Sequence, residues 1–168
     1  MKNPTKFLTL LAVSLLVVSF IASCNKKAEE NTERETATES TFNLTTAKAE
    51  IEAANNEFMT LFASIDSLGL SNLYTQDTKF MMTGAPSITG RESVVSTFSG
   101  IMKSGISRID LKTLEVWGND GLITEEGEYS LYAGDTQADH GKYLVLWKNV
   151  EGKWKLHRDI FNTDVSAE

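Results

Sequence analysis

The stretch that decides the fold lies near the end of the chain, where residues 141–162 read GKYLVLWKNVEGKWKLHRDIFN. Two strand-like runs, 141–150 and 153–162, flank Glu151-Gly152, a pair typical of a tight hairpin turn. Residues 143–147 are apolar on both sides of the predicted strand, whereas an antiparallel strand with one wet face should alternate. The sequence therefore predicts a hairpin in a sheet that is covered on both faces.

Two further strands are predicted upstream of this hairpin, at 106–117 and 122–133. The segments Asn119-Asp120-Gly121 and 134–139 separate them from each other and from the hairpin. A break in the alternation between Leu111 and Leu114 predicts a bulge, which would bend the sheet.

Helical periodicity precedes these strands. Apolar residues recur at three- and four-residue spacing and predict a first helix, with the polar face on the other side (apolar residues Ile51, Ala54, Phe58, Leu61, Phe62 and Ile65; polar residues Glu50, Glu52, Asn55, Asn56, Glu57 and Thr60). Asp66-Ser67 reads as the cap of a short second helix at 68–74, followed by a strand at 78–83 and a third helix at 92–103. Three helices followed by an antiparallel meander predict an α+β domain, with the helices on one face of a curved sheet.

The start of the chain carries an export signal. Residues 7–22 hold no charge, follow Lys2 and Lys6, and lead into Ile21-Ala22-Ser23-Cys24, which contains the single cysteine. The order of an aliphatic residue, two small residues and a cysteine resembles the lipobox of bacterial lipoproteins, in which the cysteine is diacylated and becomes the mature N-terminus. We therefore expect a lipid anchor on Cys24 in the cell envelope, at the outer membrane in preference to the inner one. A plain signal peptide or an uncleaved membrane anchor are the alternatives.

Residues 24–43 follow as a predicted flexible tether, rich in charged and small polar residues, and the domain is expected from residue 44 to 168. The acidic run behind Cys24 resembles the surface-export signals of Bacteroidetes lipoproteins, which would imply surface display. Removal of residues 1–23 leaves 14 basic and 23 acidic side chains, a formal charge of −9. Such a charge argues against nucleic acid as a partner, because phosphate binding needs clustered Lys and Arg.

An ordered set of residues along the domain resembles the SnoaL-like, nuclear transport factor 2-like superfamily, and within it most closely the domain of unknown function 4440. The set is Asp66, Leu73-Tyr74, Asp77, Gly90-Arg91, Glu126-Gly127-Glu128-Tyr129, Gly141-Lys142-Tyr143, Trp147, Gly152, Trp154-Lys155, Asp159 and Asn162. The resemblance implies a cone-shaped domain with an apolar pocket in its mouth, and a homodimer through the strands around Leu146. The superfamily includes isomerases, dehydratases and hydrolases as well as modules without chemistry, so the fold leaves the activity open.

The resemblance also argues against steroid isomerisation. In the ketosteroid isomerases of this superfamily, one tyrosine stabilises an enolate and one aspartate moves a proton. Counted from Tyr74, those positions hold Phe58 and Met82, which can neither donate a hydrogen bond to an oxyanion nor accept a proton. We therefore favour a lipid-anchored module that binds a small apolar molecule or a partner.

The polar chemistry that remains lies on the last strand. His157 and Asp159 are two residues apart, so on a regular strand they would face the same side and could form a general acid–base pair of an isomerase, dehydratase or hydrolase. The alternative is that both serve the structure alone.

The expected pocket residues are Phe58, Met82, Tyr129, Tyr143 and Phe161, because they combine apolar bodies with two hydroxyls that could orient a ligand. Glu125, Glu126 and Glu128 are interpreted as a solvated strand face. Two histidines, one cysteine and no carboxylate cluster at ligand spacing predict no metal and no cofactor.

Overall fold

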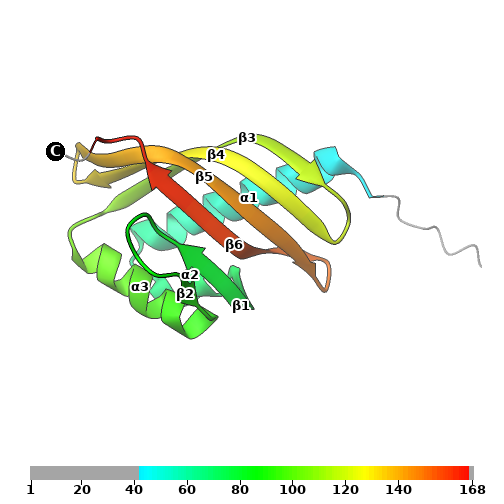
Figure 1. Ribbon diagram of the computed structural model, residues 1–168, viewed down its shortest axis with the longest axis horizontal. Helices are drawn as coiled ribbons and strands as arrows, with labels where there is room; N and C mark the ends of the chain where they lie inside the picture. Colours follow the sequence, from blue (N-terminus) through cyan, green and yellow to red (C-terminus); the bar gives the residue numbers. More distant parts are fainter. Residues whose placement is uncertain (1–41, 167–168) are drawn as a thin grey trace, which may run out of the picture. The chain divides into compact units, whose positions relative to one another are not determined.

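The computed structural model describes residues 42–166, which form one sheet of six strands with helices packed against it (Figure 1). The elements in chain order are α1 (Leu44–Ala63), α2 (Ser67–Ser71), β1 (Tyr74–Met81), β2 (Ile88–Thr89), α3 (Arg91–Lys103), β3 (Arg108–Gly118), β4 (Leu122–Ala133), β5 (Thr136–Val150) and β6 (Lys153–Thr163). The predicted signal peptide, Cys24 and nearly all of the tether lie outside the described residues. No helix within residues 42–166 has the length and hydropathy needed to cross a membrane.

Two side chains start the first two helices. The Asn43 side chain accepts a hydrogen bond from the Thr46 amide, and Asp66 accepts one from the Gly69 amide at 2.7 Å, so each satisfies a free donor in the first turn. The predicted cap at Asp66 is therefore confirmed. The predicted second helix is too long, because α2 ends at Ser71 and Tyr74 already opens β1.

The sheet has the order β2-β1-β6-β5-β4-β3. The strands from β3 to β6 form the predicted antiparallel meander, but β1 pairs with β6 in parallel. The sheet is therefore mixed, and the β1–β6 pair departs from the expected antiparallel arrangement. A parallel pair is possible here because β1 and β6 are not joined by a hairpin but are separated in the chain by the elements from β2 to β5.

The predicted bulge is present in β3, where the register with β4 shifts between Thr113 and Glu115. Leu114 is the unpaired residue and is 41% exposed. Bulges increase twist and bend, which fits the curved sheet in Figure 1. Helices α1 and α3 cover the inner face of this sheet, and the core between them includes Ile51, Phe62 and Trp147.

Candidate functional site

A cavity lies between the inner face of the sheet and the helices α1 and α3. It spans about 600 Å³ including its open mouth, of which about 70 Å³ can hold the centre of a water molecule. One water needs only about 10–15 Å³ of such space, so the cavity has room for a compact molecule of several heavy atoms. Its wall contains seven aromatic rings, from Phe58, Phe62, Phe80, Phe98, Tyr129, Tyr143 and Phe161.

Asp159 is the ionisable carboxyl group in the cavity wall. The residue is 7% exposed, and its Oδ2 accepts a hydrogen bond of 2.7 Å from the Tyr74 hydroxyl. Burial raises the pKa of Asp159 to about 7, although the Tyr74 hydrogen bond acts in the opposite direction and the nearby charge of Glu125 adds to the rise. Burial and the Asp159 charge also raise the pKa of Tyr74, so its hydroxyl stays protonated and serves as the donor. Asp159 can therefore exchange a proton near neutral pH.

A second buried carboxyl group, Glu125, lies on the same row of the sheet, because Val145 pairs with Glu125 on one side and with Asp159 on the other. Glu125 is fully buried and accepts four hydrogen bonds. Its Oε1 accepts from Asn55 Nδ2 at 2.7 Å, from Thr113 Oγ1 at 2.6 Å and from the Tyr143 hydroxyl at 2.8 Å, and its Oε2 accepts from Trp147 Nε1 at 2.8 Å.

The asparagine and tryptophan groups in this set can only donate, so the set suits a carboxylate anion. The interpretation of Glu125 as part of a solvated face is wrong. Alternation along β4 gave the signal, since Ile123, Glu125, Gly127 and Tyr129 share one side of the strand.

Asn55 is a second residue whose role the sequence analysis missed. It was assigned to the polar face of the first helix, but it is 5% exposed and lines the cavity. The spacing of Ile51, Asn55, Phe58 and Phe62 by four, three and four residues places it on the buried stripe of α1.

Two glycines of the sheet make room for the cavity tyrosines. Gly127 pairs with Tyr143 across β4 and β5, and a Cβ at Gly127 would lie 2.1 Å from the Tyr143 ring. Gly141 pairs with Tyr129, and a Cβ there would lie 2.9 Å from that ring and 2.1 Å from a backbone oxygen. Each ring thus lies across the backbone of the opposite glycine, which directs both side chains along the inner face of the sheet.

The expectation that His157 and Asp159 face the same side is wrong. The register between β5 and β6 shifts between Leu146 and Trp147, which pair with Arg158 and Leu156, so His157 is an extra residue at a bulge. Its Nδ1 lies 3.0 Å from Thr75 Oγ1 and 3.5 Å from the Asp77 carboxylate, and His157 does not form part of the cavity wall. Burial lowers the pKa of His157, and the positive charge of Arg158 lowers it further.

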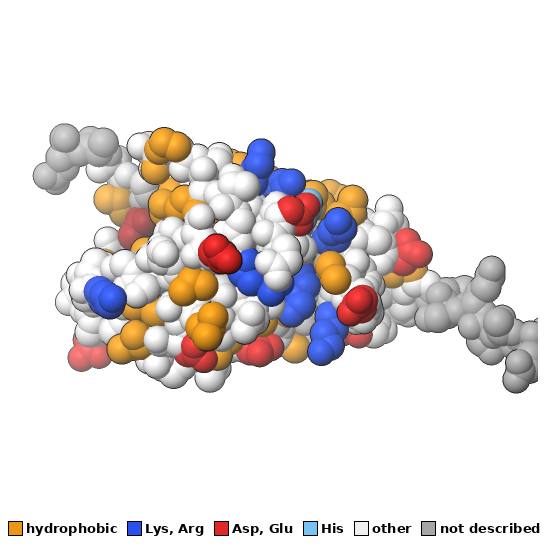
Figure 2. All heavy atoms as spheres, turned by 90° about the horizontal axis from the view of Figure 1, so that it is seen from below, with side chains coloured by type: hydrophobic (Ala, Val, Ile, Leu, Met, Phe, Trp, Pro, Cys, Tyr) orange, Lys and Arg blue, Asp and Glu red, His pale blue; other side chains and the backbone are white. Residues whose placement is uncertain are grey.

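Figure 2 shows that Lys and Arg side chains gather near the middle of one face of the domain.

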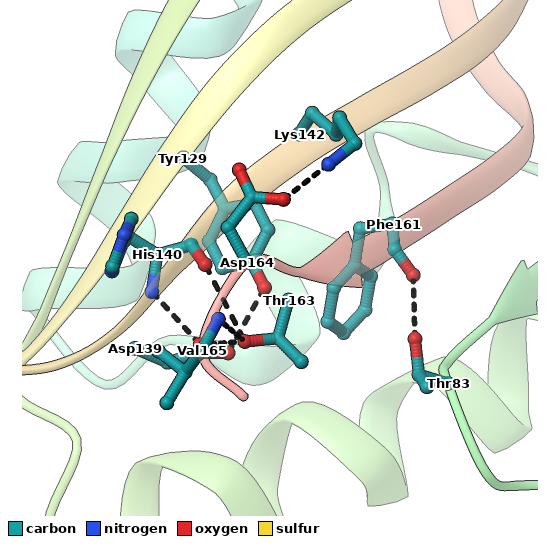
Figure 3. Close-up of polar contacts among 9 residues, drawn as sticks. All are labelled: Thr83, Tyr129, Asp139, His140, Lys142, Phe161, Thr163, Asp164 and Val165. Atoms are coloured by element: carbon teal, nitrogen blue, oxygen red, sulfur yellow. Dashed lines mark hydrogen bonds and ion pairs between the residues drawn. The ribbon is translucent and has the colours of Figure 1, made fainter. Parts of the chain in front are cut away.

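Beside the cavity, a polar cluster holds Tyr129 (Figure 3). Its hydroxyl donates to Asp139 Oδ2 at 2.9 Å, and Thr163 Oγ1 donates to Asp139 Oδ1 at 2.5 Å. Burial and this hydrogen bond raise the pKa of Tyr129, so the tyrosine stays neutral. The cluster connects β4, β5 and the end of β6 beside Phe161, and it keeps the negative charge of Asp139 close to the cavity.

Four of the five predicted pocket residues are in the cavity wall: Phe58, Tyr129, Tyr143 and Phe161. Met82 is not part of the wall, although it packs against the core. It follows the end of β1, whereas Phe80 within that strand supplies the ring that faces the cavity. Contact of any of these residues with a ligand stays a prediction.

The same fold occurs in solved structures of low sequence identity. A domain of unknown function with a cystatin-like fold from Nostoc punctiforme is 12% identical, with a TM-score of 0.64 over 73% of this chain and 80% of the other. An NTF2-like protein with a cystatin-like fold from Novosphingobium aromaticivorans is 17% identical, with a TM-score of 0.60 over 74% and 86% of the two chains. The fold is cystatin-like and NTF2-like.

A further solved structure has a name that refers to an activity. A ketosteroid isomerase-like protein from Erwinia carotovora atroseptica is 18% identical, with a TM-score of 0.59 over 70% of this chain and 96% of the other. No family model and no curated protein matches this chain. At such identities the likeness concerns the fold alone.

Proposed function

We propose that this protein is a lipid-anchored NTF2-like domain of the cell envelope, from the branch named domain of unknown function 4440, that binds a small and mostly apolar molecule in its cavity. The observation that carries the proposal is the cavity itself, whose wall is aromatic and aliphatic except for Asn55, Asp159 and the hydroxyls of two tyrosines. Small-molecule sites have this composition, with apolar walls for affinity and a few polar groups for orientation.

Ligand binding can be tested by native mass spectrometry of the full chain isolated from its own envelope. Ile101 is half-buried in the cavity wall on α3, so Ile101→Trp should fill the cavity, whereas Leu68→Trp places the same ring at a position that is 65% exposed. We expect a bound small molecule in the wild type and in Leu68→Trp, and none in Ile101→Trp. A molecule retained equally by all three proteins, or by none, would contradict the proposal.

The anchor requires a separate test, because it depends on residues 21–24 alone. Each acyl chain contributes about 0.8 kcal/mol per buried methylene, so two or three chains should hold the protein on a membrane through washes at high salt. Cys24→Ser should abolish labelling by an alkyne fatty acid and block cleavage by signal peptidase II. Labelling that persists in Cys24→Ser, or a wild-type protein found entirely in the soluble periplasmic fraction, would disprove the anchor.

A second candidate function is proton transfer, in an enzyme of the isomerase, dehydratase or hydrolase type. The specific observation in its favour is that Asp159 lies in the cavity with a pKa of about 7. His157 lies at the bulge and does not form part of the cavity wall. Tyr74, whose hydroxyl contacts Asp159, would therefore take the place of His157 as the partner of Asp159. Turnover of any substrate that is lost in Asp159→Asn but kept in Asp135→Asn would support this function.

A further inference from the structure

Once Asp159 is ionised, the polar groups that face the cavity can only accept hydrogen bonds. Asn55 uses its amide nitrogen to contact Glu125 at 2.7 Å and Thr113 at 3.2 Å, so the acceptor Glu125 fixes the orientation of the amide and its Oδ1 points elsewhere. Asp159 uses Oδ2 to accept from Tyr74. Within the described residues, neither Asn55 Oδ1 nor Asp159 Oδ1 has a hydrogen-bond partner.

Asn55 and Asp159 both line the cavity. In the described part of the chain, no fully buried side-chain nitrogen or oxygen lacks a partner. Asn55 Oδ1 and Asp159 Oδ1 therefore keep some exposure, and the space available to both residues is the cavity that they line. The Tyr143 hydroxyl donates its single hydrogen to Glu125, which leaves only lone pairs for a ligand. When Asp159 is ionised, a ligand that satisfies this wall must supply the hydrogen atoms itself.

The rest of the wall suits a cation. Seven aromatic rings surround the cavity, and the face of an aromatic ring attracts ammonium groups. The buried carboxyl group of Asp159 is part of the wall, that of Glu125 lies behind it, and Asp139 contacts the wall residue Tyr129. Among the described residues, no Lys, Arg or His forms part of the wall, so no cationic side chain occupies this space.

We propose that the cavity selects a small apolar amine, bound as an ammonium ion between the aromatic rings and Asp159. The proposal rests on the proposed function of the cavity as a small-molecule site, and it adds the class of ligand. The ammonium group donates hydrogen bonds to Asp159 Oδ1 and Asn55 Oδ1, while its hydrocarbon part fills the aromatic space. A ketone, an aldehyde or an enolate offers only lone pairs, which cannot form hydrogen bonds with the ionised Asp159 or with Asn55 Oδ1.

The proposal has a pH signature. The charged or titratable groups that face Asp159 are Tyr74 on β1, Glu125 on β4 and Tyr143 on β5, and the pKa of each tyrosine is raised, so both stay neutral. Asp159 itself must be ionised to pair with an ammonium ion. With a pKa of about 7, its ionised fraction rises nearly tenfold between about pH 6 and about pH 8, while an alkylammonium group stays protonated.

Four probes of one shape test the selection: benzylamine, benzyl alcohol, benzaldehyde and ethylbenzene. Their affinities are measured by calorimetry and ligand-observed NMR on the full chain in lipid nanodiscs, with empty nanodiscs as the blank. We expect benzylamine to bind at least about tenfold tighter than benzaldehyde or ethylbenzene at about pH 8, and about tenfold weaker at about pH 6. Asp159→Asn should abolish this preference, and Asp135→Asn, in the exposed turn after β4, should keep it.

The outcomes separate the two proposals. Binding of ethylbenzene or benzaldehyde as tightly as benzylamine would overturn the selection of an amine and leave the small-molecule cavity in place. An affinity for benzylamine that does not change with pH, or that falls as pH rises, would also overturn it, and this measurement needs no variant. If no probe binds while Ile101→Trp and the wild type behave alike, both proposals fail.

Discussion

Replacement of Asp159 by asparagine should stabilise the fold, by an amount that grows from about pH 4 and is complete above about pH 7. The carboxyl group is 7% exposed and has a pKa of about 7, against 3.8 in an exposed chain. The folded state therefore holds a proton that the unfolded chain has released between about pH 4 and about pH 7, and the free energy of unfolding falls as the pH rises through this window. At 1.36 kcal/mol per pH unit, the full difference corresponds to about 4 kcal/mol above pH 7.

Asparagine cannot ionise, yet its Oδ1 can accept the same hydrogen bond from Tyr74. The difference in unfolding free energy between Asp159→Asn and the wild type should thus grow from near zero at about pH 4 to about 4 kcal/mol at about pH 8. Urea unfolding of the purified full chain, followed by tryptophan fluorescence, measures this difference, because Trp147 is fully buried in the core. Asp135→Asn serves as the control at an exposed turn and should show no such trend.

The same experiment can refute the reasoning. A difference that is equal at both ends of the pH range would mean that Asp159 does not gain a proton on folding. A difference that grows towards acid would mean that the carboxylate is stabilised in the fold, contrary to the cost of its burial.

Two further predictions concern the sheet. Gly127→Ala should lower the free energy of unfolding by about 3 kcal/mol, because the new Cβ would overlap the Tyr143 ring. The control Gly100→Ala, in α3 with open space around it, should be neutral or stabilising. An equal effect of the two substitutions in urea unfolding would contradict the packing argument. The outer face of the sheet should mediate a homodimer. Leu144→Glu, at a position 45% exposed on β5, should therefore shift sedimentation towards the monomer, whereas Leu68→Glu should not. A wild-type protein that is monomeric at tens of micromolar would refute the dimer.

Sequence patterns predicted the parts of the fold that rest on local physics. The hairpin at Glu151-Gly152, the bulge between Leu111 and Leu114, and the cap at Asp66 all follow from residues close in the chain. The pairing of β1 with β6 in parallel does not, because it joins segments far apart in sequence and replaces the last residues of the predicted second helix. Tyr74 illustrates the difference, since its tertiary contact with Asp159 outweighs the helical pattern around it.

The site was predicted in part, and the misses have two physical causes. The bulge at His157 moves one of two residues off the expected face, and a single inserted residue leaves no mark in the residue types of that strand. Glu125 and Asn55 were assigned to solvent by their polarity, although their spacing placed both on buried faces.

The two missed residues share an explanation with the chemistry of the cavity. A buried carboxylate is tolerated only when donors surround it, and Glu125 takes its donors from Asn55, Thr113, Tyr143 and Trp147. Asn55 and Tyr143 donate their hydrogens to Glu125 and not to a ligand, so the cavity offers only oxygen lone pairs once Asp159 is ionised. Asp159, with one oxygen held by Tyr74 and one free, then decides by its own charge whether an ammonium ion can bind. In the proposed site, Glu125 therefore selects the ligand indirectly, because Asn55 and Tyr143 donate to Glu125 and can only accept from a ligand.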